Sequence, residues 1–258
     1  PPPSPEETRV LERIGAPPMV RLACQTRPTA PLSMIPLLPP TSSPRDAGPR
    51  PAYHMGEERE IIILFADLRD FTRFSERKLP YDVVFVLNRY FANMGSAVTD
   101  AGGHLDKFIG DGVMALFGVD GRPDVGARQS LEAARLMSVR LDELNQSLEA
   151  ELEEPLRIGI GIHAGPAIIG EMGYGAATSL TAIGDAVNTA SRLEAMTKEH
   201  RAQLVVSQTV ADHAGVDLGG FPSHQLAVRG RTGSIEARVI INAQDLPQDL
   251  LHGTKKTA

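Results

Sequence analysis

Two aspartates in the sequence stand where their carboxylates could bind a metal ion. Asp67 follows the apolar run 61–65, and Asp111 lies in the tight Gly-Asp-Gly turn 110–112 between two short β-rich segments. If those strands are neighbours in one sheet, both carboxylates project from the same edge, and such hard oxygen ligands suit Mg²⁺ completed by substrate phosphates. Each residue also has an ordinary interpretation, because Asp67 could cap the following helix and Asp111 could be only a turn former.

Three further polar or charged side chains are candidates for a binding site. Asn188 and Arg192 are four residues apart in a segment expected to be helical, so they share one helix face. Arg192 offers a planar fork for phosphate oxygens, and its charge does not titrate away. Lys107 lies four residues before Asp111. On a strand the two side chains would point to the same face but lie too far apart to belong to one site. Each could instead be an ordinary surface residue, on a solvated helix face or flanking a strand.

Strand-like and helical segments that alternate from about residue 57 must position these residues. The continuous apolar run 61–65 predicts a strand buried on both faces. Apolar residues at helical spacing predict helices at 81–101, 124–150 and 185–199. Further strands are expected in two hairpins, turned by Asp-Gly and by Gly165-Pro166, and in the C-terminal part: 104–109 with 113–117, 157–163 with 167–170, then 204–206, 218–228 and 237–241. Antiparallel hairpins among helices predict an α+β fold rather than a doubly wound sheet.

Composition narrows the class of protein. The 258 residues are 42% hydrophobic and 22% charged, which is typical of a globular domain with a substantial core. A formal net charge of −6 argues against a nucleic-acid partner. The single cysteine excludes an internal disulfide and fits a reducing compartment, so we expect a cytoplasmic location, with a membrane tether as the alternative for a longer parent protein. The absence of a long apolar run or a signal peptide predicts no membrane contact by this fragment.

Residues 1–56 differ in composition from the rest, because they hold most of the 20 prolines. Proline fixes φ and removes a backbone donor, so long regular elements are not expected there. One short helix is predicted, with Ser4 as N-cap, Pro5 at the first position and Glu6 and Glu7 in the first turn. Residues 35–56 are interpreted as a Pro-rich linker.

Four segments that contain the candidate residues resemble the motifs of class III adenylyl/guanylyl cyclase catalytic domains. They occur in the order of the family and are residues 65–72, 107–117, 159–166 and 183–193. The resemblance spans about residues 57–242. It implies a ferredoxin-like βαββαβ core with an antiparallel-rich sheet and flanking helices, in a catalytic domain over 57–245 with a tail at 246–258.

The resemblance also implies roles for individual residues. Asp67 and Asp111 match the two metal-binding aspartates, which would hold two Mg²⁺ or Mn²⁺ ions. Lys107 matches the residue that reads the adenine ring. Asn188 and Arg192 match the pair that orients the ribose and stabilises the pentavalent phosphorus. In the family the two sets come from different subunits, so a homodimer with shared active sites is expected.

Four further positions are assigned to the substrate by the same resemblance. The backbone that leads to Phe71 and Thr72 matches the stretch in contact with the triphosphate. Arg229 stands where the family usually has a lysine near the β- and γ-phosphates, with Arg231 close behind. Either arginine could bind phosphate, although Arg binds in a bidentate manner where Lys is a point charge.

Thr181 occupies the second base-reading position, and with Lys107 it resembles the bacterial and bicarbonate-responsive subgroup. Guanylyl cyclases typically have Glu and Cys at these two positions. Lysine can donate to a purine ring nitrogen, and a threonine hydroxyl can accept from the exocyclic amine of adenine. Thr181 could also be a plain strand residue. We therefore expect ATP as substrate, with cyclic AMP and pyrophosphate as products. The alternatives are a guanylate or mixed-specificity cyclase and an inactive regulatory domain.

Cys24 lies in an Arg-Leu-Ala-Cys-Gln context that resembles the C-terminal part of [2Fe–2S] ferredoxin domains. Such a cluster needs three earlier cysteines, which this chain lacks. Because the chain also begins without methionine, residues 1–34 are interpreted as the remnant of a ferredoxin-like domain. Cys24 would then be a cluster ligand only in a longer parent protein; the alternative is a free thiol in the Pro-rich segment.

Overall fold

The computed structural model describes residues 3–13, 16, 20–22, 56–173, 178–227, 234–248 and 250–251. Contacts divide the chain into two compact units, Pro1–Ala52 and Tyr53–Ala258, and each is treated by itself. Some residues singled out in the sequence lie outside the described part: Cys24, Arg229, Arg231 and the side chain of Thr72. Among the described residues, no helix combines the length and apolar composition needed to cross a bilayer.

The first unit contains the short helix α1, Pro5–Arg13. The hydroxyl of Ser4 accepts a hydrogen bond from the Glu7 amide at 3.2 Å, as the N-cap prediction requires. The buried Glu7 carboxylate accepts two side-chain hydrogen bonds from Arg21 at 2.8 Å and one from the amide of Leu22 at 2.8 Å. These contacts tie the segment after the helix back onto its first turn.

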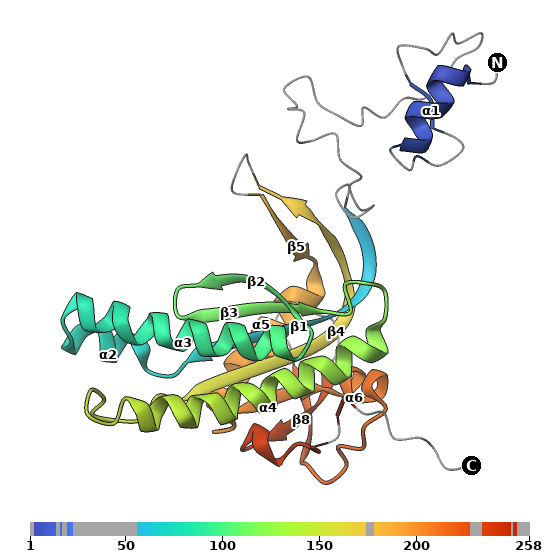
Figure 1. The fold of residues 1–258 in the computed structure, drawn as a ribbon. Helices are drawn as coiled ribbons and strands as arrows, with labels where there is room; N and C mark the ends of the chain where they lie inside the picture. Colours follow the sequence, from blue (N-terminus) through green and yellow to red (C-terminus); the bar gives the residue numbers. More distant parts are fainter. Residues whose placement is uncertain are drawn as a thin grey trace. The chain divides into compact units, whose positions relative to one another are not determined.

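The second unit is built on an eight-stranded sheet with the order β2-β3-β1-β4-β6-β8-β7, and β5 pairs with the end of β4 (Figure 1). Its strands are β1 (Glu57–Leu68), β2 (His104–Ile109), β3 (Gly112–Phe117), β4 (Ile158–Met172), β5 (Ser179–Ile183), β6 (Leu204–Ser207), β7 (Ser223–Ala227) and β8 (Ser234–Ile240). Neighbours are antiparallel except β4 and β6. Residues 61–64 of β1 are fully buried and Phe65 is half-buried, so the strand expected over 61–65 is confirmed and its burial is complete over the first four residues.

Helices cover both faces of this sheet. On one face α3 (Pro80–Asp100) and α4 (Pro123–Ser147) run side by side, and α6 (Gln208–Ala214) packs against α4 (Figure 1). On the other face α5 (Asp185–Glu199) lies against β4. The order β1-α3-β2-β3-α4-β4, with the strands arranged β2-β3-β1-β4, confirms the predicted α+β fold of βαββαβ type.

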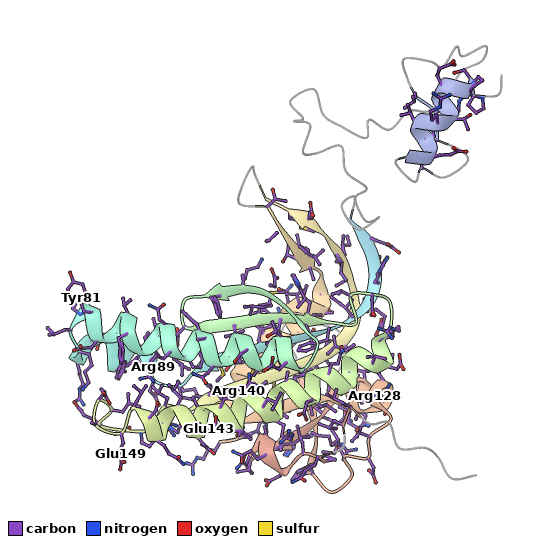
Figure 2. All side chains as sticks on the ribbon, in the orientation of Figure 1. Tyr81, Arg89, Arg128, Arg140, Glu143 and Glu149 are labelled. Atoms are coloured by element: carbon purple, nitrogen blue, oxygen red, sulfur yellow. The ribbon has the colours of Figure 1, made fainter. Side chains whose placement is uncertain are left out.

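Polar contacts join the two long helices along their shared edge. Arg140 of α4 is labelled in Figure 2. It donates to the Asp100 carboxylate and to the Ser96 hydroxyl of α3, both at 2.6 Å. Beneath them, residues such as Tyr90, Met94, Leu131 and Met137 are fully buried. The helices expected at 81–101 and 124–150 are therefore confirmed, although α4 ends at Ser147, three residues earlier than expected.

The predicted hairpin turn at Gly165-Pro166 is wrong, because both residues lie inside the single strand β4. Pro166 pairs with Glu60 of β1 on one side. On its other side β4 pairs with β6 at 160–162 and with β5 at 168–172, so Pro166 lies between those two ladders. A proline is tolerated at such a place because, on that side of β4, no partner strand needs its missing N–H.

Two smaller differences concern the C-terminal part. The strand expected at 218–228 is confined to β7, since Gly219 and Gly220 form a turn in which Gly219 donates to the Asp217 side chain at 2.7 Å. Helix α6 was not predicted. It is only seven residues long, too short to give a clear helical periodicity.

Gly161 allows α5 to lie directly on β4. A Cβ atom at this position would fall well inside van der Waals contact with the amide nitrogen of Glu194 and the carbonyl oxygen of Ala190, both in the α5 backbone. We expect Gly161→Ala to lower the free energy of unfolding by about 2–3 kcal/mol, because the helix must shift to make room. Urea unfolding followed by circular dichroism measures the change.

Gly220→Ala provides the matched control, because no atom lies within 4 Å of a Cβ built there. Its effect is expected to stay within about 0.5 kcal/mol. Equal unfolding midpoints for the two variants would show that the close approach of α5 to β4 is not what Gly161 provides.

Candidate active site

The structure brings Asp67 and Asp111 to one cleft. Asp67 is the penultimate residue of β1, and Asp111 lies in the turn between β2 and β3, next to β1 in the sheet. Both line a cleft of about 550 Å³. Asp67 does not cap the following helix α2 (Phe71–Arg77), whose N-cap position is held by Asp70. The arrangement at one sheet edge is the one that the sequence predicted.

Charge in this cleft is predominantly negative. Burial, and then the neighbouring Asp111 carboxylate, raise the pKa of Asp67 to about 6, while Arg69 opposes the shift. Burial also raises the pKa of Glu194, from α5, to about 7, again against Arg69, whose guanidinium lies 3.3 Å from the Glu194 carboxylate. Carboxylates that resist ionisation together favour a bound cation.

These carboxylates fit a divalent metal ion only in part. The described residues contain no group of three or more His, Cys, Asp or Glu side chains placed to hold a metal by themselves. The Asp67–Asp111 pair would therefore need further oxygen ligands from a substrate or from water. That is the usual condition of Mg²⁺ in phosphate-transferring sites.

Asp67→Asn is expected to stabilise the metal-free protein at pH 7.5. Because the folded pKa of this acid lies above its unfolded value, the folded chain keeps a proton that the unfolded chain releases, and stability falls as pH rises from about 4 to about 6. The asparagine avoids that loss, worth about 1–2 kcal/mol after allowance for solvent screening of a half-exposed group. Thermal unfolding in EDTA at pH 4 and pH 7.5 measures it, with little difference expected at pH 4.

Adding Mn²⁺ at pH 7.5 is expected to make the unchanged chain the more stable of the two, because its Asp67 carboxylate can bind the cation and the asparagine amide binds it poorly. Asp82→Asn is the control, since Asp82 is exposed in the first turn of α3. An Asp67→Asn protein that Mn²⁺ stabilises as much as the unchanged chain would argue against a metal at this residue.

A second cluster joins β2 to β5. The Lys107 ammonium donates to the Thr181 hydroxyl at 3.0 Å, so the two residues assigned to the base meet within one chain. The Thr181 hydroxyl in turn donates to the carboxylate of Asp106 at 2.6 Å. Sequence analysis did not single out Asp106, although it directly precedes Lys107.

Asn188 and Arg192 lie one turn apart on α5, as predicted. Asn188 is exposed and Arg192 is partly exposed, while the face toward the sheet is formed by Thr189 and Leu193. The residues that line the cleft of the carboxylate pair include Glu194 and Lys198 of this helix but neither Asn188 nor Arg192. Lys107 and Thr181 do not line it either. Within the described part of one chain, the predicted site residues thus form separate groups.

Two residues of the cleft were missed by the sequence analysis. Arg69 stands within a segment that carried the resemblance and Glu194 directly follows another, yet a surface role for each was as plausible as a site role. Their ion pair forms because Gly159 has no side chain, and a Cβ there would overlap the Arg69 guanidinium. Phe71, which was predicted, also lines the cleft and packs against Phe74 with ring centroids 5.7 Å apart.

The fold is shared with nucleotidyl cyclases of known structure. The guanylyl cyclase Cya2 is 30% identical, covers 75% of this chain and 97% of its own, and superposes with a TM-score of 0.67. The adenylyl cyclase CyaB from P. aeruginosa is 26% identical, covers 74% of this chain and 99% of its own, and has a TM-score of 0.63.

Residues 53–236 match the family described as the adenylate and guanylate cyclase catalytic domain, and the chain belongs to this family. An adenylate cyclase of Anabaena cylindrica is 40% identical over 156 residues, which are 59% of this chain and 30% of that protein. The terminal-differentiation adenylate cyclase of Dictyostelium discoideum is 33% identical over 189 residues, 72% of this chain and 9% of that protein. The chain thus spans less than a third of these relatives.

Proposed function

We propose that the chain is the catalytic domain of an adenylate cyclase, which converts ATP to 3′,5′-cyclic AMP and pyrophosphate in a homodimer. The observation that carries the proposal is the Asp67–Asp111 pair at the end of β1, where burial and mutual repulsion favour a cation. Several relatives are named adenylate cyclase, which supports ATP as the substrate. The proposed catalytic domain spans residues 57–245 and acts in the cytoplasm.

The reaction is an intramolecular phosphoryl transfer. The 3′-oxygen of the ribose attacks the α-phosphorus, the bond to the β-phosphate oxygen breaks, and pyrophosphate leaves while the hydroxyl proton passes to solvent. Bound Mg²⁺ or Mn²⁺ would lower the pKa of the 3′-hydroxyl and offset phosphate charge. Asp67 and Asp111 would hold these ions, and the backbone before Phe71 and Thr72 would contact the triphosphate. No protein nucleophile is needed, since positioning and electrostatics supply the rate.

The partner chain supplies the remaining groups in this proposal. Asn188 orients the ribose, and Arg192 stabilises the charge on the pentavalent phosphorus. Lys107 and Thr181 hold the adenine ring. Because these four residues do not line the cleft of the carboxylate pair in their own chain, a two-fold dimer that faces each set with the other completes two equivalent sites. Arg229 or Arg231 would reach the β- and γ-phosphates.

A second candidate is a guanylate or mixed-specificity cyclase, favoured by the similarity to guanylyl cyclase Cya2. Lys107 argues against it, because the N1 atom of guanine carries a hydrogen that a lysine cannot accept. A third candidate is an inactive regulatory domain. The complete set of predicted site residues argues against loss of activity.

Product analysis with the purified chain distinguishes the three candidates. The chain is incubated with ATP or GTP and with Mn²⁺ or Mg²⁺, and cyclic nucleotide and pyrophosphate are quantified. We expect cyclic AMP and pyrophosphate in equal amounts, with kcat/KM for ATP at least about tenfold above that for GTP. Faster cyclisation of GTP would favour the second candidate, and no cyclic product from either nucleotide would favour the third.

A further inference from the structure

Asp106 lies at a break in the pairing of β2 with β3. The residues on either side of it pair with consecutive residues of β3, Ala115 and Met114, so Asp106 is an extra residue with no partner across the ladder. Neighbouring side chains of a regular strand point to opposite faces of the sheet. A β-bulge interrupts this alternation and can redirect a side chain. As a result, Asp106 and Lys107 both reach Thr181 on β5.

The three side chains form a connected polar cluster. The Thr181 hydroxyl donates to Asp106 Oδ2 at 2.6 Å and accepts from Lys107 Nζ at 3.0 Å. Lys107 Nζ also lies 3.5 Å from Asp106 Oδ1. The Asp106 side chain is 0% exposed, whereas the Lys107 side chain is 42% exposed, so the cluster opens to solvent on the lysine side.

In this arrangement the Thr181 hydroxyl donates its only proton to Asp106. A hydroxyl has one proton to donate and two lone pairs with which to accept. The Asp106 carboxylate can only accept, so it takes the proton, and Lys107 occupies one lone pair. What remains on Thr181 for a ligand is a single acceptor site. Lys107 keeps a further N–H to donate beside it.

We infer that Asp106 is a specificity-determining positioning residue that makes Thr181 an obligate hydrogen-bond acceptor toward the purine base. The inference rests on the proposed function, in which Lys107 and Thr181 hold the base. An acceptor next to a donor matches the 6-amino group and N1 of adenine. It opposes the 6-oxo group and the N1–H of guanine or hypoxanthine at both positions.

Asp106→Asn is the sharpest test, because the amide is isosteric and Lys107 determines how it turns. The amide oxygen would face the Lys107 ammonium, which leaves the NH₂ group toward the Thr181 hydroxyl. The hydroxyl must then accept from the amide, and its proton becomes free to donate to the substrate. Thr181 would tolerate a 6-oxopurine that the unchanged chain rejects.

The experiment measures kcat and KM for ATP and inosine triphosphate with Mn²⁺, for the unchanged full chain and for Asp106→Asn. We expect the ratio of kcat/KM for ATP to that for inosine triphosphate to fall at least about tenfold in the variant. A purely structural role would lower both values together and leave their ratio unchanged. Asp120→Asn is the control, since Asp120 is exposed and paired with Arg122, and its ratio should not change.

Further variants cover a failure of Asp106→Asn to fold. Asp106→Ser also removes the carboxylate and should lower the same ratio, and Thr181→Val should do so by removing the hydroxyl while keeping the shape. An ATP preference that survives in every folded variant of this set overturns the inference. An unchanged chain that cyclises neither nucleotide contradicts the proposed function instead, so the two failures are distinguishable.

Discussion

Asp111→Asn and Arg192→Ala are each expected to lower ATP cyclisation at least about a thousandfold, while an equimolar mixture regains about a quarter of the normal activity. The first change removes a proposed metal ligand, and the second removes the cation proposed to stabilise the phosphorus. Asp111 lines the cleft with Asp67, and Arg192 does not. If each site combines one set from each chain, the two defects can be separated into different sites.

The fraction recovered follows from random pairing. Half of the dimers formed in the mixture contain one copy of each variant. In such a dimer one site has both defects and the other has neither, so one site in two is intact. One quarter of all sites should therefore be active. Cyclic AMP production by a mixture incubated long enough for subunit exchange measures this fraction.

The matched control mixes Asp111→Asn with Asp67→Asn. Both changes affect the carboxylate pair, so every site in every dimer keeps one defect and no recovery is expected. Thermal unfolding must show that all three variants are folded. Recovery in the control mixture, or none in the first mixture despite subunit exchange, would contradict a site shared between chains.

The second large effect is expected at Lys107. We expect the double change Lys107→Glu with Thr181→Cys, the pair typical of guanylyl cyclases, to lower ATP cyclisation at least about a hundredfold without producing an efficient GTP cyclase. The reason is Asp106, whose buried carboxylate would face a second carboxylate in place of the Lys107 ammonium now 3.5 Å away. A buried charge that loses its partner is destabilising, by about 1–3 kcal/mol for a pair that is open to solvent on one side.

Adding Asp106→Asn to this double change is expected to restore thermal stability and to raise GTP cyclisation. The comparison of double and triple variants by melting temperature and by kcat/KM for GTP isolates the contribution of residue 106. A double variant that is already stable and active with GTP would show that Asp106 does not constrain the choice of base.

The sequence predicted those parts of the fold that depend on regular patterns. The apolar run of β1 and the helical spacings of α3, α4 and α5 identified the central strand and the helices that cover it, because burial imposes those periods. The Gly165-Pro166 turn was mispredicted because local turn preference cannot show that β1 pairs without a break with residues 158–169 of β4. The pairing of β4 with the distant strand β1 keeps residues 165 and 166 in an extended strand.

The sequence predicted those residues of the site that stand in recognisable motifs, and it missed those that depend on contacts in the folded chain. Asp67 and Asp111 meet because β1 and β3 are neighbours in the sheet, which the sequence analysis had left as a condition. Asp106 was missed because strict alternation would point it away from Lys107, and a β-bulge has no reliable signal in one sequence. The ion pair of Arg69 with Glu194 was missed because it depends on the missing side chain of Gly159, a contact between distant segments.

The separation of the carboxylate pair from the other predicted site residues on one chain has a kinetic consequence. A chain alone would hold two incomplete sites, so at concentrations well below the dimer dissociation constant the rate would grow with the square of chain concentration. Dilution would silence the enzyme without unfolding it. Tethering two copies sets a local concentration of about millimolar for short flexible connections. Whatever holds two such domains together or apart would then control the rate while leaving Asp67, Asp111 and Arg192 untouched.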